Sequence, residues 1–131
     1  MQLAKPIVKD KLVRGYLECL FWSEMDQTND QGCSPLEDNY SPDDLAPCAM
    51  QLIEADCAKF LERAETSIPH LLDDHFLEQI GHDFWLTRNG HGAGFWDGDY
   101  DKAAGDELTR LAREFGTINA VVGDDGLIYL E

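Results

Sequence analysis

The side chains that could carry out catalysis or bind a metal ion gather near the middle of the sequence. His82 and Asp97 lie at the two ends of the segment GHDFWLTRNGHGAGFWD, which spans residues 81–97. A histidine held by an aspartate could position its imidazole for acid–base catalysis or for metal binding. Such a pair is also a common hydrogen-bonded strand end, and no motif places a serine or cysteine nucleophile beside it. The segment therefore offers a candidate site without naming a reaction.

A second candidate follows directly, because Asp97, Asp99 and Asp101 match the first three ligand positions of a calcium-binding loop. The match fails at Lys102, where the loop requires glycine, and at Leu108, where it requires a bidentate glutamate. Formation of a local turn and capping of the next helix is the alternative role for these aspartates. The sequence predicts no bound metal and no cofactor.

The cysteines give no stronger signal for a metal. They are far apart and include no C-x-x-C pair, which favours reduced thiols, mostly small core residues. A zinc site that joined them to His70 or His75 would match no standard ligand spacing. The four are Cys19, Cys33, Cys48 and Cys57.

The elements expected to position His82 and Asp97 are two strands joined by Asn89-Gly90. Both central positions of a type I′ turn need positive φ, which these two residue types tolerate best. Strand 83–88 is therefore expected to pair with strand 91–96, and this register brings His82 near Asp97.

The same hairpin places Trp85 and Trp96 on one face. Trp85 then lies across from Gly94, where a large ring stabilises the glycine-bearing strand. If helices cover only the other face, the two tryptophans form an exposed platform for a partner.

Helical periodicity covers most of the remaining chain. A broad apolar face predicts a helix over residues 11–24. Ser41-Pro42-Asp43-Asp44 predicts a short first turn, and Pro47 places the start of the main helix, which runs to about Ala64. A shorter helix is expected over about 69–80 and a fourth one ends at Gly116. Residues 25–40 lack periodicity and are expected to form a long loop.

A final hairpin is expected from residues 118–122 and 127–130, which flank Gly123-Asp-Asp-Gly126. The predicted fold class is α+β, with three N-terminal helices followed by ββαββ and an antiparallel four-stranded sheet. At 131 residues the chain is expected to form a single domain over 1–131.

The charge of the chain narrows the choice of partner. Ten basic residues against 26 acidic ones give a formal net charge of −16. Such a surface repels nucleic acid and anionic membranes and attracts basic partners, with Asp43 and Asp44 as candidate steering residues. The alternative explanation of the acidic charge is that it keeps the protein soluble. The chain shows neither a long apolar run nor a signal-peptide pattern, so we expect a cytoplasmic protein.

Several motifs together resemble a family of small uncharacterised proteins of tailed bacteriophages and prophages. They are the stretch over residues 38–47, GHDFWLTRNGHGAGFWD over 81–97 and VGDDGLIY over 122–129. The resemblance implies a bacterial host cytoplasm and an accessory role that acts on host machinery. In character, though not in motif, the chain is also similar to acidic DNA-mimic inhibitors of defence systems.

Three hypotheses of function follow from the sequence. The first is a non-enzymatic accessory protein that binds a basic surface of a host protein, such as a defence or nucleic-acid-binding protein. The second is a small metal-dependent or His/Asp hydrolase centred on residues 82–99. The third is a structural domain that associates with itself through its tryptophan face.

Overall fold

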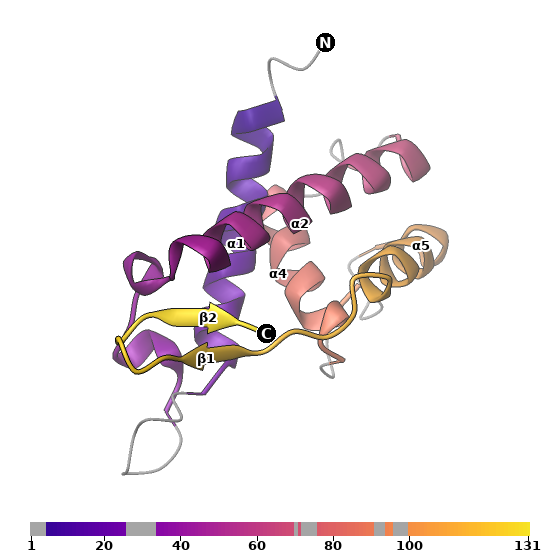
Figure 1. Ribbon diagram of the computed structural model, residues 1–131. Helices are drawn as coiled ribbons and strands as arrows, with labels where there is room; N and C mark the ends of the chain where they lie inside the picture. The colour runs from indigo at the N-terminus through magenta and orange to yellow at the C-terminus, as the bar shows by residue number, and fades with distance from the viewer. Residues whose placement is uncertain (1–4, 26–33, 70, 72–75, 91–93, 96–99) are drawn as a thin grey trace.

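A bundle of helices carries a small terminal hairpin in this protein (Figure 1). The computed structural model describes residues 5–25, 34–69, 71, 76–90, 94–95 and 100–131, with side chains from Asp10 onward. The elements, in chain order, are α1 (Lys5–Ser23), the 3-10 turns η1 (Leu36–Asp38) and η2 (Pro42–Asp44), α2 (Pro47–Ser67), α4 (Leu77–Arg88), α5 (Lys102–Arg113), β1 (Ala120–Val122) and β2 (Ile128–Leu130).

The central contact of the bundle is the packing of α1 on α4, which is the most extensive between any two described elements. Leu12, Tyr16 and Leu20 recur at helical spacing on α1 and are fully buried. Glycines let the two backbones approach closely here. A Cβ atom on Gly15 would lie 1.9 Å from the carbonyl oxygen of Glu78, and one on Gly81 would lie 2.0 Å from that of Leu12.

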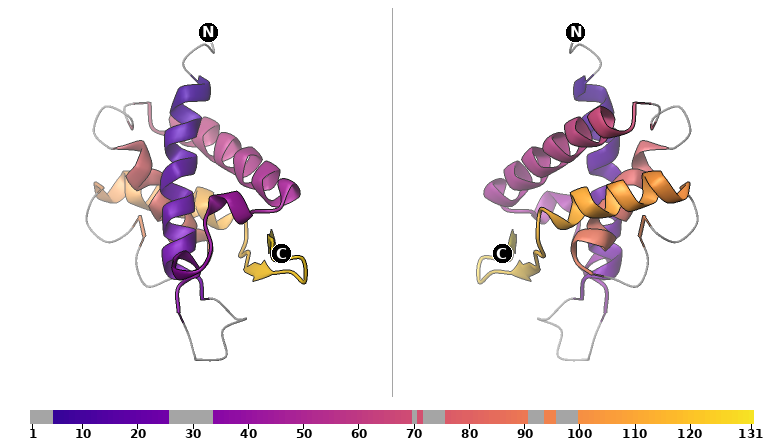
Figure 2. Two further views of the ribbon diagram at one scale, coloured as in Figure 1. Left: turned by 90° about the vertical axis from the view of Figure 1, so that its left-hand side faces the viewer. Right: turned by 90° about the vertical axis from the view of Figure 1, so that its right-hand side faces the viewer.

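Helix α2 crosses α1 obliquely, as the views in Figures 1 and 2 show. Its start agrees with the sequence prediction, because η2 forms a separate first turn and Pro47 is the first residue of the main helix. The N–H of Ser41 donates to the Asp44 carboxylate at 2.9 Å and closes the η2 turn. The buried face of α2 includes Ile53, Phe60 and Ala64, as its periodicity predicts.

The terminal hairpin also agrees with the prediction, although its strands are short. β1 and β2 pair antiparallel with Val121 opposite Tyr129, and Asp124-Asp125 lie in the turn. The hairpin is fixed to the start of α2, because the N–H of Ala46 donates to the carbonyl of Ile128 at 2.9 Å.

The predicted hairpin over residues 83–96 is wrong. Residues 83–88 form the last turns of α4, Asn89 is its C-cap, and Gly90 follows with φ of 72°. A left-handed glycine after a helix has the same backbone requirement as an Asn-Gly turn between strands, so the dipeptide cannot distinguish the two. Residues 91–93 and 96–99 lie outside the described residues.

The predicted fold class is wrong for the same reason. Within the described residues the structure is mostly helical and its only sheet is the two-stranded β1–β2 pair, not four strands. Of the helix expected over 69–80, Leu71 is helical and residues 77–80 form the start of α4, which continues to Arg88, while residues 70 and 72–75 lie outside the described residues. Burial almost all round α4, from Ile80 to Arg88, removes the apolar–polar period that would have marked it as a helix.

The fourth predicted helix is confirmed in place and in its ending. Asp101 is the N-cap of α5, where its carboxylate accepts a hydrogen bond from the N–H of Ala104 at 2.8 Å. Gly116 has φ of 75°, and its N–H donates to the carbonyl of Arg113 after the last turn. The capping role predicted for the aspartates is thus confirmed for Asp101.

Candidate functional site

A groove of about 550 Å³ lies between α1 and the segment that runs from η1 into α2. In Figures 1 and 2 this segment lies against the C-terminal half of α1. We call the feature the acidic groove. Its lining comprises Asp10, Val13, Arg14, Leu17, Glu18 and Phe21 of α1, Glu37, Tyr40, Ser41 and Pro42 of the loop segment, and Met50 and Glu54 of α2.

The floor of the acidic groove is apolar because α1 has two neighbouring apolar rows. One row, Leu12–Tyr16–Leu20, is covered by the bundle. The other row, Val13, Leu17 and Phe21, follows one position later at the same spacing and faces the groove. Leu17 is only half-buried, as is Met50 on the opposite wall, so the groove exposes part of the apolar surface between the two helices.

The rim of the acidic groove carries four carboxylates, Asp10, Glu18, Glu37 and Glu54, against the single guanidinium of Arg14. Among the described residues, no lysine or arginine forms an ion pair with any of the four. Carboxylates that outnumber the cations around them create a negative potential, which attracts a cationic partner and is screened by salt.

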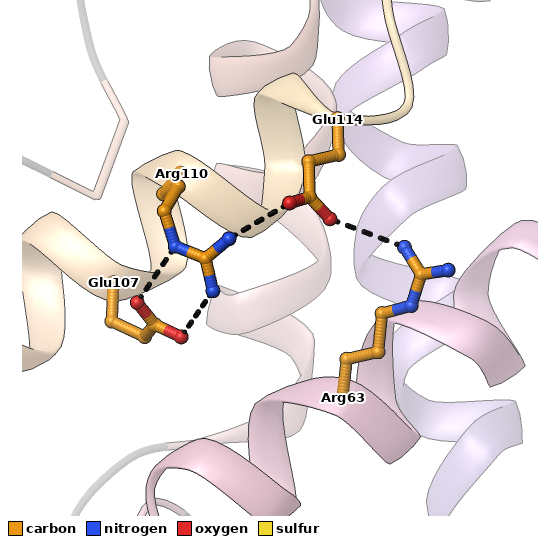
Figure 3. A network of polar contacts seen from close by, with 4 residues as sticks. All are labelled: Arg63, Glu107, Arg110 and Glu114. Atoms are coloured by element: carbon orange, nitrogen blue, oxygen red, sulfur yellow. Dashed lines mark hydrogen bonds and ion pairs between the residues drawn. The ribbon is translucent and has the colours of Figure 1, made fainter.

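On the opposite side of α2, acidic side chains form ion pairs with arginines. Figure 3 shows Arg63 of α2 beside Glu114, the C-cap residue of α5, and Arg110 between Glu114 and Glu107. The guanidinium of Arg110 contacts both oxygens of Glu107, at 3.0 and 2.7 Å, and this lowers the pKa of Glu107. Glu107 and Glu114 are therefore paired with arginines, whereas the four carboxylates of the acidic groove form no such pairs among the described residues.

A second hollow of about 520 Å³ adjoins the acidic groove and shares Glu18 and Glu37 with it. We call it the Trp22 hollow. Trp22 is 56% exposed, and its ring centroid lies 6.1 Å from that of His82 on α4. The complete lining is Glu18, Trp22, Glu37, Glu78, Gln79 and His82.

His82 therefore lies in a setting different from the predicted one. It is half-buried on α4, and burial lowers its pKa although the nearby Glu18 carboxylate opposes this shift. The strand pairing that would have brought it to Asp97 does not form, since residues 83–88 are helical. Asp97 and Asp99 lie outside the described residues, and Asp101 caps α5.

The part of the chain that the structure describes contains no cluster of three or more histidine, cysteine, aspartate or glutamate side chains arranged to hold a metal ion. Cys19 and Cys57 are buried thiols and Cys48 is an exposed one, while Cys33 is outside the described residues. Burial raises the pKa of the Cys19 thiol, so its reactive thiolate is disfavoured.

The tryptophan expected to contact a partner is a core residue instead. Trp85 is fully buried, its indole N–H donates to the hydroxyl of Ser23 at 2.8 Å, and its ring packs edge-on against Tyr16. Trp96 lies outside the described residues. Asp43 is exposed on η2, and Asp44 accepts the turn hydrogen bond of Ser41; neither lines the groove.

Sequence reasoning missed Trp22, although a signal was present. Leu20, Phe21 and Trp22 are consecutive on a helix, and a rotation of about 100° per residue cannot bury all three on one side. Two of them are buried and Trp22 is exposed. A helical projection of residues 11–24 would have marked it as the apolar side chain left outside.

None of the described helices is long and apolar enough to cross a membrane. Comparisons of the chain with models of protein families, with curated proteins and with solved structures found no match. The resemblance to phage and prophage proteins therefore stays a prediction.

Proposed function

We propose that this protein acts without catalysis, by binding a basic amphipathic segment of another protein in the acidic groove. The observation that carries the proposal is the combination of an apolar floor with a rim of carboxylates that lack ion-pair partners among the described residues. A helical segment with leucine-like side chains on one side and arginine or lysine on the other would complement both features.

The net charge of −16 also supports binding of a basic segment, because it would steer a cationic partner toward this protein over long distances. Together with the resemblance to phage and prophage proteins, this favours an accessory role in the cytoplasm of a bacterial host. Host defence and nucleic-acid-binding proteins carry basic surfaces of this kind and are the class of target that we propose.

The contribution of the apolar lining of the groove can be measured with a synthetic amphipathic helix that carries leucines on one face and arginines on the other. Met50→Asp places a charge on the apolar wall opposite α1, and we expect it to raise the Kd for this peptide by about tenfold, which corresponds to about 1.4 kcal/mol. Leu52→Asp is the matched control, since Leu52 is on the same helix but outside the lining. Fluorescence anisotropy of the labelled peptide gives both values.

The contribution of the rim has a different kinetic signature. Glu37→Lys and Glu54→Lys are each expected to slow association of the same peptide, most at low ionic strength, because exposed charges act mainly on the encounter rate. Glu62→Lys makes the same charge change on α2 outside the groove. Stopped-flow association rates at low and high salt measure the effect, and equal slowing by all three variants would show that total charge, and not the groove, guides the partner.

A further inference from the structure

The Trp22 hollow contains an exposed indole that the packing of the molecule does not explain. Trp22 lies near the end of α1, directly after Leu20 and Phe21, which are buried. Its exposed ring forms a wall of a hollow about 520 Å³ in volume, which is large enough for a long side chain. Exposed tryptophans surrounded by polar residues are a common feature of binding hot spots.

The charges around this indole select a cationic side chain. The carboxylates of Glu18, Glu37 and Glu78 line the hollow together with Gln79, and no lysine or arginine is in that lining. His82, which forms another wall, has a lowered pKa because it is partly buried, so it is neutral at pH 7 and does not repel a cation.

We infer that Trp22 is a stacking platform for an arginine side chain of the bound segment. A guanidinium is flat, so it can lie on the indole face while its N–H groups reach the carboxylates at the edge of the hollow. The more compact ammonium group of lysine can make the charge contacts without the stacking. A guanidinium over an aromatic ring also occurs inside this protein, where the guanidinium carbon of Arg88 lies 5.7 Å from the centroid of the Phe84 ring.

The position of the hollow links this inference to the acidic groove. Glu18 and Glu37 line both features, so one bound segment can place an apolar side chain on the groove floor and an arginine on Trp22. The inference therefore rests on the proposed function and specifies it: the partner segment carries a large apolar residue and an arginine on adjoining parts of its surface.

The test compares two synthetic amphipathic helices that differ only in having arginine or lysine at every cationic position. The wild-type protein is expected to bind the arginine peptide about two- to fivefold more tightly, the range for an exposed cation–π contact. Trp22→Leu is expected to remove this preference, mainly by weakening the arginine peptide, and Trp22→Phe to retain part of it. Phe76→Leu is the control, because Phe76 is 78% exposed but lines neither feature.

Each outcome has a definite meaning once circular dichroism has established that the variants are folded. A preference for arginine that survives in Trp22→Leu, or equal binding of both peptides to the wild type, overturns the inference. If Met50→Asp still weakens both peptides in that case, the proposed function stands without it. If neither peptide binds the wild type at low salt, the proposed function fails and the inference fails with it.

Discussion

Replacing Arg88 with alanine is expected to destabilise the fold by about 3–5 kcal/mol, the usual cost of removing one partner from a buried ion pair. The Arg88 side chain is 3% exposed and pairs with the Asp56 carboxylate at 2.8 Å. It also donates to the backbone carbonyls of Gly116 and Phe115 and to the hydroxyl of Tyr16. Truncation leaves a carboxylate and two carbonyls without their donors, and it loosens the junction of α1, α2 and the end of α5.

Thermal unfolding measured by circular dichroism tests this expectation. For a domain of this size the melting temperature should fall by roughly 10–20 °C. Arg88→Lys should not restore it, because an ammonium cannot reproduce the planar set of donors. Arg110→Ala is the control: it removes an arginine from the exposed network of Figure 3 and should change the melting temperature little. A melting temperature for Arg88→Ala within a few degrees of the wild type would contradict this account of the core.

The second large effect is expected from Gly81→Ala on α4. Alanine normally stabilises a helix relative to glycine by about 1 kcal/mol. Here the added Cβ atom would lie 2.0 Å from the carbonyl oxygen of Leu12 and 2.8 Å from the amide nitrogen of Tyr16. Both are backbone atoms of α1, so the helices must separate, and we expect a net loss of about 3 kcal/mol or more.

Gly81→Ala is thus expected to lower the free energy of unfolding, whereas the same substitution in an exposed helix would raise it. Denaturant titration measures this free energy. Gly15→Ala should have a similar effect, since its Cβ atom would meet the carbonyl of Glu78. The double variant should lose less than the sum of the two single losses, because one separation of α1 from α4 relieves both clashes. Stabilisation by either substitution would show that the two helices do not approach as closely as described.

Local signals in the sequence were sufficient to predict the elements whose ends depend on one or two residues. Pro47 fixes the start of α2, Asp101 caps α5, and Gly116 follows its last turn. Each of these residues has a backbone or capping property that acts within a few positions. The terminal hairpin was predictable for the same reason, because its turn residues lie between short apolar runs.

The sequence could not specify α4, because the information there is tertiary. Asn89-Gly90 satisfies a helix end as well as a hairpin turn, and the burial of Asp83, Thr87 and Arg88 breaks the expected apolar pattern. Arg88 can be buried only because Asp56, more than thirty positions earlier, supplies its counter-charge. The hydroxyl of Tyr100 similarly donates to the Asp83 carboxylate at 2.8 Å. No local spacing predicts such pairs.

The sequence predicted the negative charge of the candidate site but not its position in the fold. Net charge indicated a basic partner, but the acidic groove exists because α1 lies beside residues 37–54, a juxtaposition that depends on the whole bundle. Composition also could not show which tryptophan is exposed. Trp85 is fully buried through its contacts with Tyr16 and Ser23, whereas Trp22 remains open to solvent.

The central claim is that the acidic groove is where a basic amphipathic segment binds. The most direct measurement is a titration of ¹⁵N-labelled protein with the leucine–arginine peptide, followed by amide chemical shifts. The account predicts that the largest shifts cluster on residues 13–22 of α1, 37–42 and 50–54, with little change in α5 or in the β1–β2 hairpin. Shifts that centre on α5, or that spread evenly over every acidic surface, would contradict it.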